Sequence, residues 1–493
     1  MFKTFFMNIT KTSILLIAIP LVLAAFTHLW NPVGFPDIFY DEGVYMYRAM
    51  HMMAGLGPQV DYFHDHPFFG QLFLAGALSL TGYPDSLHPG NDVNSVQMLY
   101  LVPRVLMGIL AIFDTFLIYK ISERRYSGKV AMLASVMFAV MPITWIMRRI
   151  LLDSILLPFL LTSILFAIYA KDSKNKNLLV VLSGIFLGIT LFTKETMFTM
   201  IPLIAVLVYQ GTKNRKMLAL WFIPVILIPL IWPLQSVQDN QFQYWIKDIL
   251  FQVHRQNSNF GNLVENFFYF DPFVLILGLA GIVYAILKKD YIILLWFVPF
   301  LAFLVSVGYS QYFYWIPVLP VLCIAASKLI MDLVAKAKQD VRRRLPYVVI
   351  SCMAVFGFTM TCFLVTSNIS AQYDAAAYVL SNVHNIANDK NNTTIVSSAA
   401  YSWMFQYVYH IPDTMKDYRA LLFHPITTNH VILIADLHFK SNLNAGKQLS
   451  DMYYNTTLVK KFWGGVLEED LGKYPFTSMN ANYEGSEIEI RTR

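Results

Sequence analysis

The sequence has little charge for its length. Of its 493 residues, 14% are Asp, Glu, Lys or Arg, whereas an ordinary soluble domain has about 25%. Hydrophobic residues make up 56% of the chain, and the mean hydropathy is +0.50. A soluble chain of this length folds into several domains that need charged surfaces. The shortage of charge therefore excludes a soluble multidomain protein and predicts a polytopic membrane protein.

Cysteine is also scarce. The three cysteines, Cys323, Cys352 and Cys362, all lie in apolar runs, which excludes a disulfide framework and a cysteine-based metal site. The 23 glycines and 22 prolines are too few for a collagen-like or low-complexity chain. The net charge of +6 is modest, and we expect no nucleic-acid partner.

Apolar runs of about 17 to 25 residues are typical of membrane-spanning helices. Prolines interrupt several of these runs, which the interior of a helix bundle tolerates. The runs predict about eleven transmembrane helices, near 13–30, 99–119, 130–147, 151–170, 178–193, 196–210, 217–236, 272–287, 291–309, 314–334 and 346–366.

Lys and Arg are concentrated in alternate loops between these runs. Because such residues favour the cytoplasmic side, we expect a cytoplasmic N-terminus, and an odd number of spans then places the C-terminus outside. The predicted domains are a transmembrane catalytic domain over 1–367, with outer loops at 31–98 and 237–270, and an extracytoplasmic soluble domain over 368–493.

The soluble tail is predicted to be a small α/β domain. A helical pattern covers 373–388, and strand-like runs follow at 393–399 and 430–435. Three glycosylation sequons, at Asn391, Asn392 and Asn455, agree with an outward-facing tail.

The first outer loop carries adjacent carboxylates, Asp41 and Glu42, just after the first predicted span. Ionisable residues close to a membrane are candidates for function. A structural alternative is that Asp41 is the N-cap of a helix over 44–54 and that Glu42 is favoured by the helix dipole.

The same loop contains His64-Asp65-His66. Side chains at i and i+2 of an extended strand lie on one face, so both imidazoles could bind one divalent metal ion. The alternative is a polar loop whose side chains bond to each other and to the backbone.

Several cations lie at the same predicted depth on the outer side, where the positive-inside rule disfavours them. Arg149 and Asp153 are four residues apart, which predicts an ion pair on one face of a helix. The shared depth indicates one site, and its other cations are Arg104, Arg148, Lys194 and Arg255.

These motifs resemble the protein O-mannosyltransferases. Asp41-Glu42 and His66-Pro67 resemble the DE and HPP elements of that family, although Phe68 replaces its second proline. The run 149–154 resembles its R-x-L-L-D-S element, Arg104 matches its arginine in span two, and 312–317 resembles its aromatic entry to a late span. The resemblance covers roughly 14–335. It implies the GT-C fold, shared with lipid A aminoarabinose transferases, and a polyprenyl-phosphate-linked sugar as donor.

The resemblance implies transfer of a sugar to an acceptor, and the residue types suit this chemistry. Asp41 is the candidate base for the acceptor hydroxyl, with Glu42 orienting the acceptor or acting as a second acid or base. Cations would stabilise the leaving phosphate, and supporting roles fall to residues near them. The candidate phosphate ligands are Arg149, Lys194, Arg104, Arg148 and Arg255, and the supporting residues are Asp153, which would hold Arg149, together with His66, His64 and Asp65.

A single displacement of this kind inverts the anomeric configuration and requires no cofactor. The donor sugar is expected to be a hexose, with mannose as the family default, and a protein, a lipid or a glycan remains open as acceptor. No WWDYG-like motif is present, which argues against an oligosaccharyltransferase catalytic subunit. The alternatives are a transporter or lipid flippase, or a non-catalytic assembly protein.

Overall fold

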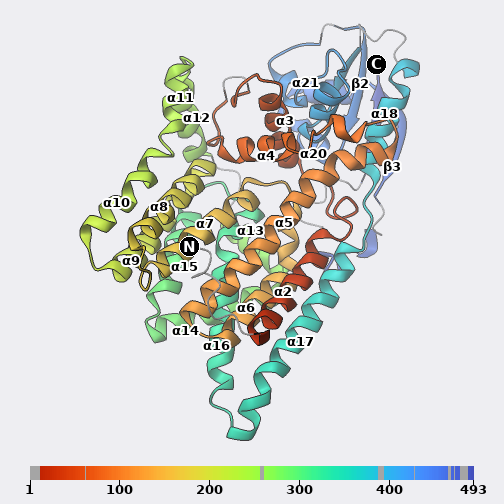
Figure 1. The fold of residues 1–493 in the computed structure, drawn as a ribbon. Coiled ribbons are helices and arrows are strands. Elements are labelled where there is room, and N and C mark those ends of the chain that lie inside the picture. The colour runs from red at the N-terminus through yellow and green to blue at the C-terminus, as the bar shows by residue number, and fades with distance from the viewer. Residues whose placement is uncertain are drawn as a thin grey trace.

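The computed structural model describes residues 11–60, 63–255, 260–386, 393–426, 428–464, 468–470, 472–477 and 487–493. It consists of a bundle of long helices and a smaller C-terminal α/β unit, drawn in blue at one end of the bundle beside α3 and α4 (Figure 1). The charged outer loop and the C-terminal unit thus lie together, away from the opposite end of the bundle.

The bundle contains the apolar helices and three 3-10 segments that interrupt or precede them. Its elements are α2 (Lys11–Leu29), α5 (Val93–Arg125), α6 (Gly128–Val140), η2 (Pro142–Arg148), α7 (Leu152–Tyr169), α8 (Lys176–Thr193), η3 (Glu195–Met200), α9 (Ile201–Thr212), α10 (Arg215–Leu227), α11 (Ile231–Gln238), α14 (Pro272–Lys288), α15 (Tyr291–Ser306), η4 (Tyr312–Val318), α16 (Leu319–Val334) and α17 (Gln339–Val365).

All eleven predicted spans fall on helical segments, but the count of eleven full spans was too high. Among the described residues, six segments are long and apolar enough to cross a membrane, and two bent helix pairs raise the number to eight. The pairs are α6 with η2, bent by 66°, and α13 (Phe260–Phe270) with α14, bent by 118°. Some of the apolar runs therefore form short or bent helices, and not each run forms one straight membrane-spanning helix.

Proline explains the bend after α6. Pro142 follows Met141, whose backbone is extended at φ −71° and ψ 140°. A residue before proline is pushed out of the α region by the proline ring, so α6 ends at Val140. The chain then continues in η2, and α7 begins only at Leu152.

The outer loop 31–98 contains α3 (Tyr40–Met53), α4 (Phe69–Ser79) and η1 (Asp85–Leu87). Helix α3 begins earlier than predicted, and its N-cap is Phe39. The Glu42 carboxylate caps the helix by accepting the backbone N–H of Phe39 at 2.9 Å. The N-cap alternative for Asp41 is therefore wrong, and Asp41 lies in the first turn. The second outer segment contains α12 (Phe242–His254) and α13.

The C-terminal unit is a mixed sheet covered by helices. The strand order is β1-β2-β4-β3, with β1 and β2 parallel and the other pairs antiparallel. Its elements are α18 (Ala371–Ile386), β1 (Thr393–Val396), α19 (Ala399–Trp403), a π-helical turn (Met404–Val408), η7 (Tyr418–Leu422), β2 (His430–Ala435), α20 (Leu437–Ser441), η8 (Leu443–Ala445), α21 (Lys447–Tyr454), β3 (Thr457–Trp463), η9 (Glu468–Asp470) and β4 (Glu487–Thr492).

The predicted α/β character of the tail is confirmed, as are its first helix and two strands. Strand β3 was not predicted because most of its residues are exposed, so it lacks a buried hydrophobic run. Of the sequon residues, Asn455 is exposed, whereas Asn391 and Asn392 lie outside the described residues.

The tail and the outer loop share one hydrophobic core. Met46 on α3 and Tyr100 on α5 cluster with Tyr373, Trp403 and Ile434 of the C-terminal unit. The Tyr100 hydroxyl donates to the Ala400 carbonyl at 2.7 Å. The C-terminal unit is thus packed directly against the helix that carries Asp41 and Glu42.

Candidate active site

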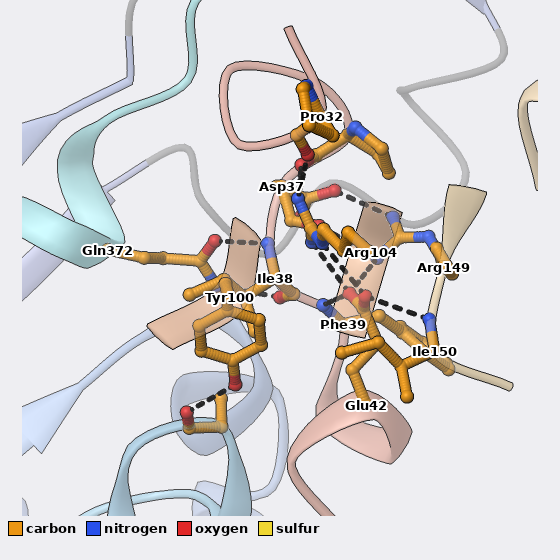
Figure 2. Close-up of polar contacts among 12 residues, drawn as sticks. Pro32, Asp37, Ile38, Phe39, Glu42, Tyr100, Arg104, Arg149, Ile150 and Gln372 are labelled. Atoms are coloured by element: carbon orange, nitrogen blue, oxygen red, sulfur yellow. Dashed lines mark hydrogen bonds and ion pairs between the residues drawn. The ribbon is translucent and has the colours of Figure 1, made fainter. Parts of the chain in front are cut away.

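Glu42 lies at the centre of a fully buried polar network (Figure 2). Arg104 donates from Nε to Oε1 at 3.0 Å and from Nη2 to Oε2 at 2.8 Å. Arg149 Nη1 lies 3.3 Å from Oε2, and the backbone N–H groups of Phe39 and Ile150 donate at 2.9 and 3.0 Å. Five donors therefore occupy the carboxylate, which has about four lone-pair positions.

The two arginines are held just as firmly. Arg104 Nη1 donates to the carbonyls of Pro32 and Pro36 at 2.9 and 2.7 Å. Arg149 Nη2 binds Asp37 Oδ1 at 2.7 Å, and both guanidinium groups also reach the Asp37 carbonyl. Arg104 is 0% and Arg149 1% exposed. Their positive charges are directed at buried carboxylates rather than at a surface where a phosphate could bind.

Glu42 stays ionised in this network. Burial raises the pKa of its carboxyl, but Arg104 and Arg149 outweigh that effect and hold the pKa below its usual value. An ionised carboxylate whose lone pairs are filled neither exchanges protons near neutral pH nor binds a further ligand. The geometry therefore favours a positioning role for Glu42, Arg104 and Arg149 over the expected contacts with acceptor and donor.

The predicted ion pair between Arg149 and Asp153 is wrong. Arg149 binds Asp37, and Asp153 instead binds Lys194, whose Nζ lies 3.0 and 2.8 Å from the two carboxylate oxygens. The i, i+4 argument fails because Arg149 and Leu151 are extended, with ψ of 147° and 149°, and the helix starts only at Leu152.

Arg148 points to a different part of the structure from Arg149. Its guanidinium contacts the backbone carbonyl of Trp30 and lies 5.8 Å from the centre of the Phe35 ring. The side chain is 0% exposed. Arg148 is therefore enclosed near the end of α2, away from a surface where a phosphate could bind.

Asp41 is surrounded by the charges of a second cluster. Burial raises the pKa of its carboxyl to about 6; the positive charges of His66, Lys194 and Arg255 lower it, while Asp65 raises it. The residue is half-buried, and no hydrogen bond to its carboxylate is found among the described residues. Asp41 therefore combines a pKa near neutrality with an unoccupied carboxylate, as a general base requires.

His64 is a structural residue of the outer loop. Its backbone N–H donates to Asp248 Oδ2 at 2.7 Å, and its Nε2 lies 2.9 Å from Gln241 Oε1. The side chain is 0% exposed. Both contacts join the loop to α12.

The next two residues have separate partners. Asp65 forms an ion pair of 2.6 Å with Arg48, and His66 Nδ1 lies 3.3 Å from Glu195 Oε2. The part of the chain that the structure describes contains no group of three His, Cys, Asp or Glu residues placed to hold a metal ion. The divalent-metal alternative for 64–66 thus receives no support from the geometry.

Burial lowers the pKa of His66, but Glu195 outweighs this effect and raises it above its ordinary value. His66 is therefore cationic over more of the neutral range. Arg255 lies 3.5 Å from the centre of the Tyr309 ring and is only partly buried. Lys194, with Nζ 4.0 Å from the centre of the Tyr314 ring, is already neutralised by Asp153. His66 is paired with Glu195 as Lys194 is with Asp153, so Arg255 is the cation of this cluster that has no carboxylate partner among the described residues.

Several partners were not identified from the sequence. Asp37 and Gln372 flank the start of α3, and Gln372 exchanges hydrogen bonds of 2.6 and 2.7 Å with the backbone of Ile38. Arg48 and Asp248 fix the 64–66 segment. The only signal in the sequence was that each is a polar residue in or beside an outer segment, because the contacts join residues far apart in the chain.

Known proteins resemble this chain in sequence over part of its length and in fold over most of it. Residues 59–252 match the sequence model of the dolichyl-phosphate-mannose-protein mannosyltransferase family, a range that leaves Asp41 and Glu42 outside. No curated protein sequence matches the chain.

Solved structures match over most of the chain. ArnT from Cupriavidus metallidurans bound to undecaprenyl phosphate is 12% identical and superposes with a TM-score of 0.56, covering 98% of each chain. The oligosaccharyltransferase AglB from Archaeoglobus fulgidus, in complex with an inhibitory peptide and a dolichol-phosphate, is 11% identical with a TM-score of 0.58, covering 93% of this chain and 75% of its own. At such identities the likeness shows the fold.

Proposed function

We propose that this chain is a membrane glycosyltransferase with the GT-C fold, similar to the dolichyl-phosphate-mannose-protein mannosyltransferase family that residues 59–252 match. In this proposal it transfers a sugar from a polyprenyl-phosphate donor to an acceptor hydroxyl, with inversion. The observation that carries the proposal is the setting of Asp41. Its carboxylate has no hydrogen-bond partner in the part of the chain that the structure describes, and it has a pKa of about 6 and faces three cations. The similar structures hold undecaprenyl phosphate or a dolichol-phosphate, which supports a lipid-phosphate donor.

The reaction follows from these charges. Asp41 accepts the proton of the acceptor hydroxyl while the hydroxyl oxygen forms a bond to the anomeric carbon. The bond from that carbon to the phosphate oxygen breaks, and the lipid phosphate leaves with the electron pair. Arg255 and protonated His66 stabilise the growing negative charge. Attack opposite the leaving group inverts the anomeric centre.

The remaining residues keep this arrangement in place. Lys194, paired with Asp153, lowers the pKa of Asp41 without binding the phosphate itself. Glu42, Arg104 and Arg149 fix the first turn of α3, and Arg48 and Glu195 orient Asp65 and His66. The donor sugar is a hexose, with mannose as the first to test, and the acceptor hydroxyl belongs to a protein in our proposal because the matched family acts on proteins.

The proposed site lies on the extracytoplasmic face. Basic residues crowd the other end, such as Arg342, Arg343 and Arg344 near the start of α17. The charged site lies at one end of the bundle, with the C-terminal unit, rather than at mid-depth (Figure 1), where a transporter would bind its substrate.

The test is transfer of label from polyprenyl-phosphate [³H]mannose, with matched glucose and galactose donors, in vesicles that contain the purified protein and an acceptor-protein mixture. Asp41→Asn should lower transfer by roughly 10²- to 10⁴-fold, as expected for loss of a general base. The matched control is Asp85→Asn, which changes an exposed carboxylate of the same loop and should retain activity. Transfer by Asp41→Asn at the wild-type rate would show that another group is the base.

Arg255→Gln should raise the KM for the donor several-fold. The control Lys288→Gln, in the last turn of α14, should leave the KM unchanged. Absence of transfer from every lipid-phosphate hexose would contradict the proposed donor class. The configuration of the product, read by NMR, must be opposite to that of the donor if the displacement is single.

A further inference from the structure

Helix α12 begins where a lipid-facing helix ends. The segment Arg215–Gln238 is a candidate membrane span, and Ile231, Leu234 and Val237 of α11 are 45–64% exposed. Asn240 turns the chain with a positive φ of 57°, and the N–H of Gln241 donates to the Ser236 carbonyl at 2.7 Å. This tight turn places α12 directly beside the exposed apolar surface of α11.

When they are arranged at 100° per residue, most side chains of α12 fall on three faces. Tyr244 and Phe251, at 47% and 51% exposed, lie apart from these faces, on the side opposite Phe242. The protein face consists of Trp245, Asp248, Ile249 and Gln252, which are buried or half-buried. The apolar stripe follows the i, i+4, i+8 and i+11 spacing of one helix face, and its members are Phe242, Ile246, Leu250 and Val253, at 39%, 41%, 51% and 65% exposed.

The third face is a polar stripe beside the apolar one, made of Gln243, Lys247 and His254, all of them exposed. A helix surrounded by water would expose four large apolar residues in a row at a cost in free energy. A helix within the hydrocarbon core would in turn bury the charge of Lys247 in lipid. Only the boundary between the two media suits both stripes.

We infer that α12 lies in the surface of the membrane, with its apolar stripe against the lipid acyl chains and its polar stripe at the headgroups. Such a helix is stabilised by its buried apolar area and by attraction of its cations to anionic lipids. Trp245, on the protein face, packs on Trp232 of α11 with ring centres 5.4 Å apart, so α12 is held next to the lipid-facing span.

The protein face of α12 is bound to the outer loop of the candidate site. Asp248 accepts the backbone N–H of His64 at 2.7 Å. Next to this face, the Phe251 ring lies 6.4 Å from the Phe63 ring of the same loop. Arg255 follows the last residue of α12 and lies on Tyr309. The contact of α12 with lipid therefore sets the height of His64 and Arg255 above the bilayer.

The experiment measures where α12 lies, without reference to activity. Single cysteines replace Gln243, Lys247, Leu250 and Val253 in turn, in a Cys352→Ser, Cys362→Ser background that retains the buried Cys323, and each is labelled with a nitroxide. The full chain is placed in vesicles of phosphatidylcholine and phosphatidylglycerol. Power-saturation EPR then compares collisions with oxygen, which dissolves in lipid, and with a water-soluble nickel chelate.

Labels on Leu250→Cys and Val253→Cys should show a several-fold higher ratio of oxygen to nickel collisions than labels on Gln243→Cys and Lys247→Cys, with a depth just below the phosphates. Equal nickel access at all four positions would place α12 in water and overturn the inference. A depth near the bilayer centre would overturn it as well, because α12 would then be part of a span. Two positions on each stripe keep the comparison valid if one variant does not fold.

Discussion

The carboxylate of Asp153 binds the ammonium group of Lys194 through both oxygens, at 3.0 and 2.8 Å from Nζ. Both side chains are nearly inaccessible to solvent. Lys194 is also one of the cations that lower the pKa of Asp41. The pair thus places a neutralised cation beside the proposed base.

Lys194→Ala should raise the pKa of Asp41, because it removes a nearby positive charge and leaves the Asp153 carboxylate unpaired. The acidic limb of the profile of kcat/KM against pH should move to higher pH. In Lys194→Leu with Asp153→Leu both charges are absent, so the shift should be smaller. If the acidic limb does not move in Lys194→Ala, the charge of Lys194 does not influence the pKa of Asp41.

The wild-type profile itself should rise through about pH 6. Asp41 must be deprotonated to accept a proton, and burial raises its pKa to about 6, so activity is lost as the pH falls below that value. His66 must be protonated to stabilise the phosphate, and its raised pKa places the falling limb on the alkaline side.

Glu195→Gln removes the carboxylate that raises the pKa of His66 and should shift the falling limb to lower pH. The rising limb should stay near its wild-type position. If the falling limb does not move in Glu195→Gln, a group other than His66 is responsible for that limb.

Glu42→Gln should destabilise the protein by about 3–5 kcal/mol, the usual effect of breaking a buried ion pair, because Arg104 and Arg149 lose their shared charged partner. Thermal unfolding of the purified protein in detergent measures this effect. The control is Glu265→Gln on α13, whose carboxylate is exposed and bonds only to Tyr269 among the described residues. Equal melting temperatures for the two variants would contradict the structural role of Glu42.

Gly43→Ala should reduce transfer by roughly 10²-fold, the effect of misplacing a catalytic group by about 1 Å. A Cβ on Gly43 would lie 2.2 Å from the backbone oxygen of Ala399, so α3 must move away from the C-terminal unit and carry Asp41 with it. Gly76→Ala on α4 meets no atom within 4 Å and should leave activity unchanged. Retained activity in Gly43→Ala would show that the packing of α3 on α19 does not set the position of Asp41.

The sequence was sufficient to predict the membrane class, the helices that lie on the eleven apolar runs and the α/β tail, because hydrophobic runs depend on local composition. It did not predict the shorter apolar helices α4 and α13. The interruption at Pro142 was expected from the proline, whereas the bend between α13 and α14 was not, because a run remains apolar across a bend. Strand β3 was missed for the opposite reason, since its exposed residues carry no burial pattern.

The shared depth of the charges grouped Asp41 with Lys194 and Arg255, whose charges act on it in the structure, but it did not include His66. Pairing was less predictable. The rule for residues four apart assumed a continuous helix from Arg149 to Asp153, whereas the extended backbone at 149–151 sends the two side chains to different partners. Asp37 and Gln372 could not be found by any local rule, since Gln372 binds a backbone 334 residues away.

The first turn of α3 is held by two different parts of the protein, the C-terminal unit and the helix bundle. Tyr40 stacks on His438 of the C-terminal unit with ring centres 4.1 Å apart, and Glu42 binds Arg104 of the bundle. Asp41 therefore lies between one residue held by the C-terminal unit and another held by the helix bundle. An acceptor that moves the C-terminal unit, even by binding to its far side, would also move the Asp41 carboxylate relative to the donor. The position of the C-terminal unit would then control when Asp41 can accept the proton.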